Sequence, residues 1–172
     1  ALVEGAVSSW AALYMQDIVT ASGFELGLGV IAFNIFMVGG WLTVDHVRGV
    51  VGVRRFLFGH IVLSFVACFV LFRYSTMSSS ILGFSLAGLG VSNLVPVAYS
   101  LAGKNKQIET PVAISIISIC SFGAFMMAPA LEGVIADLFG LKAIFIPLLI
   151  LLLAALILVQ FFGGKRIEEN SL

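Results

Sequence analysis

Long apolar runs separated by short charged breaks are the feature that most constrains the fold of this chain. Of its 172 residues, 60% are hydrophobic and only 10% are charged, whereas about 25% of the residues of an ordinary soluble domain are charged. A soluble fold needs many charged side chains on its exterior, and these runs contain too few to supply them. The sequence therefore predicts a surface that faces lipid hydrocarbon.

The apolar runs predict membrane-spanning helices. A bilayer core holds no water to pair backbone groups, so spans are helices or closed barrels, and runs without strict alternation favour helices. About 20 helical residues cross a core of about 30 Å. We predict one partial and five complete spans, at 1–16, 26–44, 56–72, 81–101, 111–135 and 143–162. Residues 1–172 then form a single all-α integral membrane domain, with 163–172 as a tail.

The first run is the shortest and begins at Ala1 rather than at a methionine. It carries Glu4 and lacks the basic start and the small-residue cleavage site of a signal peptide. We interpret this run as a helix cut off at its beginning. The chain is accordingly expected to be a fragment or the remainder of a longer gene.

The basic residues indicate the orientation, because Lys and Arg close to spans are retained in the cytoplasm. Seven of the nine basic residues fall in alternate breaks and in the tail, and only Arg73 and Lys142 fall in the other breaks. The seven are Arg48, Arg54, Arg55, Lys104, Lys106, Lys165 and Arg166. This bias predicts a multi-pass protein of the inner, or plasma, membrane with a cytoplasmic C-terminus.

Several classes of function have no residues to support them. The formal net charge is zero, so no attraction to nucleic acid is implied. Cys68 and Cys120 lie inside apolar runs without CxxC spacing or a Cys/His cluster, which disfavours a disulfide and a metal site. The sequence contains no nucleotide-binding glycine loop, HExxH or Ser/His/Asp set. We therefore expect neither an enzyme nor a cofactor.

Glu4 is the strongest candidate for a functional side chain. An intramembrane carboxylate costs roughly 2.5 to 3.5 kcal/mol to insert and usually faces a cavity or a partner. If the first helix is truncated, Glu4 lies near the midplane, with Ser8 one turn away on the same face. Both residues are then candidates for a substrate or proton pathway. If the chain truly starts at Ala1, Glu4 would instead be interfacial.

Two asparagines lie near the middle of predicted spans. Asn34 and Asn93 could each hydrogen bond a polar solute, or could hold helices together. Pro96 has no N–H, so the carbonyl of Ser92 loses its helical partner and a polar opening forms beside Asn93. Pro129 similarly frees the carbonyl four residues before it. Such kinks occur where backbone lines a cavity and also in helices without a site.

Other polar and aromatic side chains have ordinary explanations. Trp10 and Tyr14 are typical of an aromatic belt, although stacking on a substrate ring is the alternative. Glu132 and Asp137 are expected at the outer interface. The histidines, His46 and His60, flank the cytoplasmic boundary, where solvated histidines are usual.

Small residues four apart mark faces on which helices can approach closely. Gly83 with Ala87 and Ala124 with Ala128 form such pairs, and Gly39 with Gly40 permits another close crossing. These residues are expected to serve packing.

The order of several short motifs resembles the C-terminal six-helix half of the major facilitator superfamily, and within it the fucose-permease and rhizopine-transport branch. The resemblance covers essentially the whole chain. The residues that carry it are Glu4-Gly5-Ala6 with Trp10 and Tyr14, Gly40-Trp41-Leu42 with Asp45, Gly52 and Arg55, Ser92-Asn93 with Pro96, and Gly133 with Ala136-Asp137 and Gly140. The resemblance implies helices seven to twelve of that fold, the first of them truncated.

The resemblance also implies a gating loop after the second span. Asp45 would form a cytoplasmic latch with Arg48, Arg54 and Arg55, since a carboxylate at the C-terminal end of its own helix needs a basic partner or another helix's N-terminus. The superfamily usually has arginine directly after this aspartate, where this chain has His46. Because histidine stands where the superfamily has arginine, we expect the strength of the latch to be affected.

The function implied is secondary active transport of a small polar solute, with a sugar or sugar derivative as the candidate and a proton as the coupling ion. Glu4 would be the coupling or substrate carboxylate, with Asn34 and Asn93 as hydrogen-bonding partners of the solute. The expected partners are membrane lipid and a missing N-terminal six-helix half. The alternative is a non-transporting membrane remnant or assembly subunit.

Overall fold

The structure, a computed structural model, is a bundle of helices. It describes the backbone of residues 1–104 and 108–169, and the side chains of these residues other than 45–47 and 162–169. The helices are α1 (Leu2–Asp17), η1 (Gly23–Gly27), α2 (Leu28–Val51), α3 (Val53–Arg73), α4 (Met77–Val91), α5 (Leu94–Gly103), α6 (Thr110–Phe139), η2 (Leu141–Ile144) and α7 (Phe145–Glu169).

Five helical segments are long and apolar enough to cross a membrane. They are Gly23–Val44, Val53–Arg73, Met77–Gly103, Thr110–Phe139 and Leu141–Phe161. Helix α1, with 16 residues, is shorter than these. The all-α membrane architecture expected from the apolar runs is confirmed.

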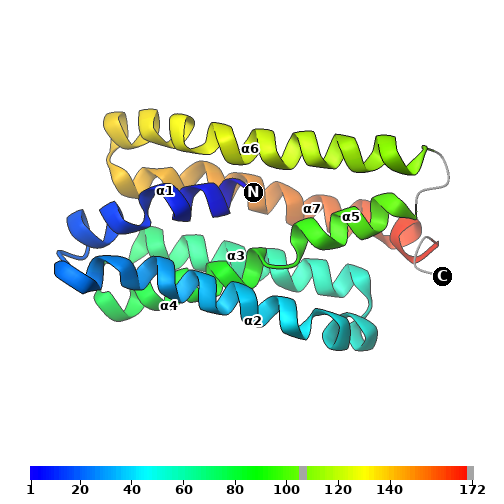
Figure 1. The fold of residues 1–172 in the computed structure, drawn as a ribbon, viewed down its shortest axis with the longest axis horizontal. Coiled ribbons are helices and arrows are strands. Elements are labelled where there is room, and N and C mark those ends of the chain that lie inside the picture. The colour runs from blue at the N-terminus through cyan, green and yellow to red at the C-terminus, as the bar shows by residue number, and fades with distance from the viewer. Residues whose placement is uncertain (105–107, 170–172) are drawn as a thin grey trace.

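The helices run along the long axis of the bundle (Figure 1). Helix α4 packs against both α2 and α3, α3 packs against α7, and α1 packs against α6. Figure 1 places the N-terminus about midway along the bundle, so α1 reaches from the middle to one end. Glu4, in the first turn of α1, therefore lies in the central part of the bundle.

Glycines allow the closest helix contacts. A Cβ atom on Gly88 of α4 would overlap the backbone of Phe33 on α2, and one on Gly90 would lie 2.6 Å from the backbone nitrogen of Ser64 on α3. Backbones can approach this closely only where side chains are absent, which is the usual basis of helix packing in lipid. Gly83, paired with Ala87 in the sequence, similarly faces Leu71 of α3.

The core is built around an aromatic cluster at one end of the bundle. Tyr14 is 1% exposed, and its ring meets Phe84 and Phe145 edge-on at centroid distances of 5.7 and 5.8 Å. Its hydroxyl donates to the carbonyl of Leu71 over 2.6 Å. This cluster joins α1 to α3, α4 and α7.

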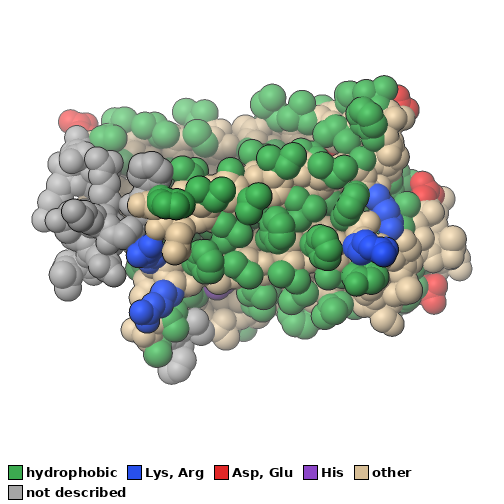
Figure 2. Space-filling model, turned by 180° about the vertical axis from the view of Figure 1, so that it is seen from behind, with side chains coloured by type: hydrophobic (Ala, Val, Ile, Leu, Met, Phe, Trp, Pro, Cys, Tyr) green, Lys and Arg blue, Asp and Glu red, His purple; other side chains and the backbone are tan. Residues whose placement is uncertain are grey.

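The surface separates charge from apolar area. Figure 2 shows a broad apolar band across one face, with charged side chains gathered toward the two ends of the bundle. The end that carries Arg54, Arg55 and Lys104 is called the basic end below; the opposite end carries Asp17 and Asp137. An apolar band between two polar ends is the surface expected of a protein that spans a bilayer.

The segment predicted as one span at 81–101 is two helices. Helix α4 ends at Val91 and α5 begins at Leu94, with Ser92 and Asn93 between them. The break follows from Pro96, which cannot donate to the carbonyl four residues earlier and whose ring crowds that carbonyl. Pro129 has a milder effect, because α6 remains a continuous helix through it.

Candidate functional site

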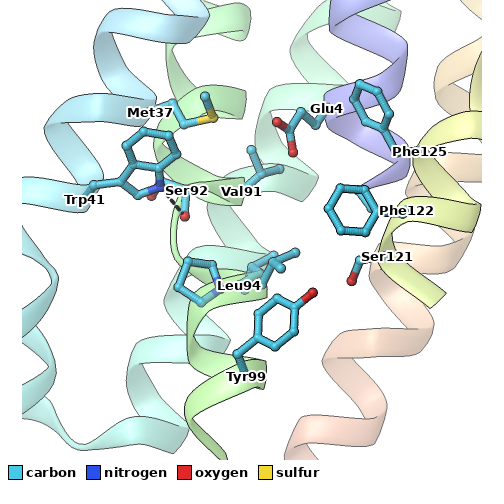
Figure 3. A pocket seen from close by; sticks show the side chains of 13 residues that line it. Glu4, Met37, Trp41, Val91, Ser92, Leu94, Tyr99, Ser121, Phe122 and Phe125 are labelled. Carbon is cyan, nitrogen blue, oxygen red and sulfur yellow. Dashed lines mark hydrogen bonds between the residues drawn. The ribbon is translucent and has the colours of Figure 1, made fainter. Parts of the chain in front are cut away.

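A groove of about 340 Å³ lies where α1, α2, α6 and the junction of α4 with α5 meet. Glu4 projects into it from α1 and is the one acidic or basic side chain among the residues that line it (Figure 3). Glu4 is half-buried. The groove therefore holds a single carboxylate in the central part of the bundle.

Aromatic side chains form much of the groove wall. Trp41 comes from α2, Tyr99 from α5, and Phe122 and Phe125 from α6 (Figure 3). Ring faces of this kind bind planar or apolar portions of a solute, while a few polar groups fix its orientation. The hydroxyl of Tyr99 lies 2.9 Å from the hydroxyl oxygen of Ser118 and ties α5 to α6.

The break between α4 and α5 supplies one edge of the groove. Trp41 donates from its indole Nε1 to the carbonyl oxygen of Ser92 over 2.7 Å. This is the carbonyl that Pro96 deprives of its helical donor, and both Ser92 and Pro96 line the groove. The opening expected at this carbonyl is thus closed by a side chain from α2.

Asn93 is buried in the bundle and does not line the groove. It is 2% exposed, and its Nδ2 donates to the carbonyl of Gly40 over 2.9 Å. The same nitrogen lies 3.3 Å from Nε2 of His60 on α3. These contacts join α2 and α3 to the helix break, so they favour the helix-joining interpretation of Asn93 over binding of a solute. His60, expected in solvent, takes part in this interior contact.

Asn34 and Ser8 are exposed and do not line the groove. The Nδ2 of Asn34 donates to the carbonyl of Val30 within its own helix over 2.8 Å. Ser8 lies one turn beyond Glu4 on α1. Of the four residues expected in a substrate or proton pathway, the structure therefore places only Glu4 in this groove.

The arginines of the expected gating loop contact different helices. Arg48 donates from both terminal nitrogens to the Ser100 hydroxyl at 3.4 Å, which links α2 to α5. Arg54 donates to the carbonyl of Gln160 on α7 over 2.6 Å. Arg55 is exposed. The side chain of Asp45 lies outside the described residues.

No break in α6 accompanies the kink expected at Pro129, and the carbonyl that Pro129 frees is covered by α1. A Cβ atom on Gly5 would lie 2.7 Å from Cβ of Ala128 and 3.3 Å from the carbonyl oxygen of Phe125, the group that Pro129 leaves without a helical donor. Helix α1 therefore packs directly over this carbonyl. The contact encloses the next turn of α6.

Glu132 lies in that next turn and is 3% exposed rather than interfacial. Among the described residues, neither of its carboxylate oxygens has a hydrogen-bond partner, and the buried indole Nε1 of Trp10 has none either. Asp137, expected at the interface with it, is exposed. The spacing of four from Ala128, a predicted packing residue, is the sequence signal that places Glu132 on the buried face.

The aromatic residues of the groove, among them Trp41 and Tyr99, are not singled out as site residues by the sequence. Trp41 was noted only as part of the motif Gly40-Trp41-Leu42. An aromatic side chain carries no charge, so nothing in the sequence distinguishes it from the other apolar residues of a span. Whether it lines a groove depends on which helix it faces.

Comparison with known proteins gives a consistent assignment. The sequence model of the Major Facilitator Superfamily matches residues 1–171. The chain is 27% identical over 140 residues to Membrane protein MosC of Rhizobium meliloti, covering 81% of this chain and 34% of that protein. It is 29% identical over 156 residues to an uncharacterized MFS-type transporter of Yersinia pestis, covering 90% of this chain and 41% of the relative.

A third relative, an uncharacterized transporter of Sinorhizobium fredii, is 28% identical over 164 residues, with 92% of this chain and 41% of the relative covered. The chain thus spans between a third and a half of the length of these curated relatives. No solved structure matches it. Because the superfamily's sequence pattern extends over residues 1–171 of an all-helical, membrane-spanning bundle, the chain belongs to the Major Facilitator Superfamily.

Proposed function

We propose that the chain is the C-terminal six-helix half of a secondary transporter and that its groove forms one wall of the solute pathway. The observation that carries the proposal is the groove itself, in which one carboxylate faces a broken helix and aromatic rings in the central part of the bundle. In transporters of this kind, solute and ion sites lie near the bilayer midplane and are formed in part by discontinuous helices.

The wall chemistry suits a small solute that has both apolar and hydroxyl-bearing faces. Trp41, Phe122 and Phe125 offer ring surfaces, while Glu4 and the hydroxyl groups of Tyr99 and Ser121 offer hydrogen bonds. A sugar ring presents C–H groups on its faces and hydroxyl groups at its edge, so a sugar or sugar derivative is the candidate solute.

Glu4 is proposed as the group that couples transport to protons or binds the solute directly. It is a carboxylate in a mostly apolar groove, where a change of its charge alters the environment of anything bound there. Proton release and binding by such a group, in step with the rocking of the two halves, would couple solute movement to a proton gradient.

The proposal requires a second six-helix half, since a solute site at midplane depth lies between two halves that move against each other. We propose that this partner covers the groove. The positive-inside rule supports a cytoplasmic basic end and a cytoplasmic C-terminus, and we propose the inner membrane as the location. The competing function is a non-transporting assembly subunit, which would tolerate the loss of the Glu4 carboxylate.

The decisive experiment compares Glu4→Gln with Asp17→Asn in the complete transporter. Glutamine keeps the shape of Glu4 and removes its titratable charge, so accumulation driven by a pH gradient should be lost. Asp17 is exposed at the far end of the same helix and outside the groove, so its variant should accumulate solute normally. Accumulation with unchanged pH dependence in Glu4→Gln would remove Glu4 from the mechanism.

Solute exchange distinguishes the two roles of Glu4. If Glu4 only couples protons, Glu4→Gln should still exchange labelled for unlabelled solute across the membrane without a gradient. If Glu4 binds the solute, exchange should fall together with accumulation. The assay uses candidate sugars in membrane vesicles, with expression of each variant measured in parallel.

A further inference from the structure

The buried face of α6 contains a carboxylate. Of the 30 residues of this helix, the three buried ones are Ala113, Ala128 and Glu132. Ala128 and Glu132 are one turn apart and face α1, where Gly5 lies against Ala128. Small residues at this crossing draw the two helices together, and the same close approach encloses Glu132.

The burial of Glu132 distinguishes it from an ordinary interfacial side chain. It is seven residues from the end of α6 at Phe139, which at about 1.5 Å per residue places it about 10 Å inside the helix end. Protein atoms rather than depth separate it from the surroundings, because it is only 3% exposed. An intramembrane acidic residue in such a position is costly unless it has a function or a partner.

No cationic partner meets this carboxylate among the described residues, and neither of its oxygens has a hydrogen-bond donor there. The basic residues near this end of the bundle have other contacts. Lys142 donates to the hydroxyl of Ser75 over 2.5 Å, and the guanidinium of Arg73 lies 5.7 Å from the ring centroid of Tyr74. An ion pair therefore does not account for the burial of Glu132.

One hydrogen-bond donor does lie beside Glu132. Trp10 of α1 packs against this turn of α6, since a Cβ atom on Gly133 would lie 3.3 Å from the indole ring. The indole Nε1 is buried without an acceptor, and the indole ring contacts Gly133, the residue next to Glu132. A single indole N–H can serve one oxygen, whereas an ionised carboxylate accepts several hydrogen bonds. The enclosure suits a neutral carboxylic acid better than a carboxylate.

We infer that Glu132 is a proton-binding site at the contact between α1 and α6, beside the indole of Trp10. The packing in the structure accommodates the protonated acid. Loss of the proton leaves an unpaired charge in this enclosure, which is relieved only if water enters or α1 and α6 separate. The site is distinct from the groove, because neither Glu132 nor Trp10 lines it.

Among the described residues, the helices around Glu132 also carry a thiol and a phenol. The Cys68 thiol of α3 is fully buried and within electrostatic range of Glu132. Tyr14 lies one turn beyond Trp10 on α1, and its hydroxyl donates to the carbonyls of Leu71 and Tyr74. The described buried residues of η2 are Ala143 and Ile144, which are apolar. Proton binding at Glu132 does not require that the chain transports a solute.

The two tryptophans of the chain make the site measurable. In a Trp41→Phe background, Trp10 is the single tryptophan, and its fluorescence reports on the site in purified protein in detergent micelles. Between about pH 4 and about pH 9, a range that brackets ordinary and perturbed carboxyl groups, the emission should shift to longer wavelength in one step, because ionisation of Glu132 admits water beside the indole.

Three variants assign the step. Glu132→Gln should abolish it, while Asp137→Asn, on the same helix and exposed, and Cys68→Ser should retain it. Persistence of the same step in Glu132→Gln, or its absence from the parent, would overturn the inference. If circular dichroism shows that Glu132→Gln does not fold, Glu132→Asp is used instead. Its shorter side chain withdraws the carboxyl group from Trp10, so the midpoint of the fluorescence step should change. An unchanged midpoint would also overturn the inference.

Discussion

The indole nitrogen of Trp41 donates a hydrogen bond to the main-chain carbonyl of Ser92 over 2.7 Å, and this is the carbonyl that Pro96 leaves without a helical donor. A side chain from α2 thus completes the backbone hydrogen bonding of the break between α4 and α5. Buried carbonyls without a partner are costly in a membrane, so we expect Trp41 and Pro96 to be energetically coupled although they do not share a helix.

This coupling predicts a specific double-mutant result. Trp41→Phe should destabilise the protein by about 1 to 3 kcal/mol, the usual cost of leaving a buried polar group unpaired. In a Pro96→Ala background the cost should fall, because the alanine N–H can bond to the Ser92 carbonyl. The measurement is unfolding by denaturant in detergent micelles, with all four proteins compared.

Pro129→Ala provides the matched control for this cycle, because it restores an N–H to α6 and not to the Ser92 carbonyl. The cost of Trp41→Phe should be the same with and without Pro129→Ala. If the cost of Trp41→Phe were also the same with and without Pro96→Ala, the indole would stabilise the groove by packing alone.

The close contact between α2 and α4 predicts a strong effect of a single methyl group. Gly88→Ala should destabilise the bundle by about 1 to 3 kcal/mol or more, because the new Cβ atom would overlap the Phe33 backbone, which cannot rotate away. Thermal unfolding in detergent would report the loss as a lowered midpoint.

Gly59→Ala on α3 is the control, since no atom lies within 4 Å of the position of its added Cβ. Alanine has the higher helix propensity, so this variant should be neutral or slightly stabilising. Equal midpoints for the two variants would mean that Gly88 of α4 does not lie against the Phe33 backbone of α2.

How much of this arrangement follows from sequence depends on the range of the interaction. The helices follow from apolar runs, and the break near Ser92 follows from the missing N–H of Pro96, both of which are local. The donor that closes the break comes from Trp41, 51 residues earlier, and no periodicity identifies such a partner.

Glu132 illustrates the same limit. Its position near the end of an apolar run made an interfacial location reasonable, and its burial depends on α1, whose Gly5 and Trp10 pack against the same turns of α6. Spacing of four from Ala128 marked the correct face of the helix. Which helix would cover that face could not be derived from α6 alone.

The charge bias predicts the orientation of the bundle in the membrane. Cysteines introduced at Ser78 and at Lys104 occupy exposed positions at opposite ends. We expect an impermeant thiol reagent added to intact cells to label Ser78→Cys and not Lys104→Cys. The exposed Cys120 is first replaced by serine to remove background labelling.

Ser78 lies beside the Thr76–Ser79 capping box of α4 without taking part in it, so its replacement should leave the helix start intact. Permeabilised cells should label both sites and serve as the control. Labelling of Lys104→Cys alone in intact cells would reverse the orientation and move the C-terminus outside.

The proposal of a transporter half predicts that this chain does not transport by itself. A solute site between two halves requires one half to move against the other, and one wall cannot alternate its access. The chain would be reconstituted in liposomes alone, and also with the six-helix N-terminal half of the complete transporter supplied as a separate polypeptide. Uptake of candidate sugars under a pH gradient should appear only with both polypeptides and should disappear again with Glu4→Gln. Saturable uptake by the chain alone would instead indicate that two copies pair across the groove of Glu4 and Trp41, each serving as the other's missing wall.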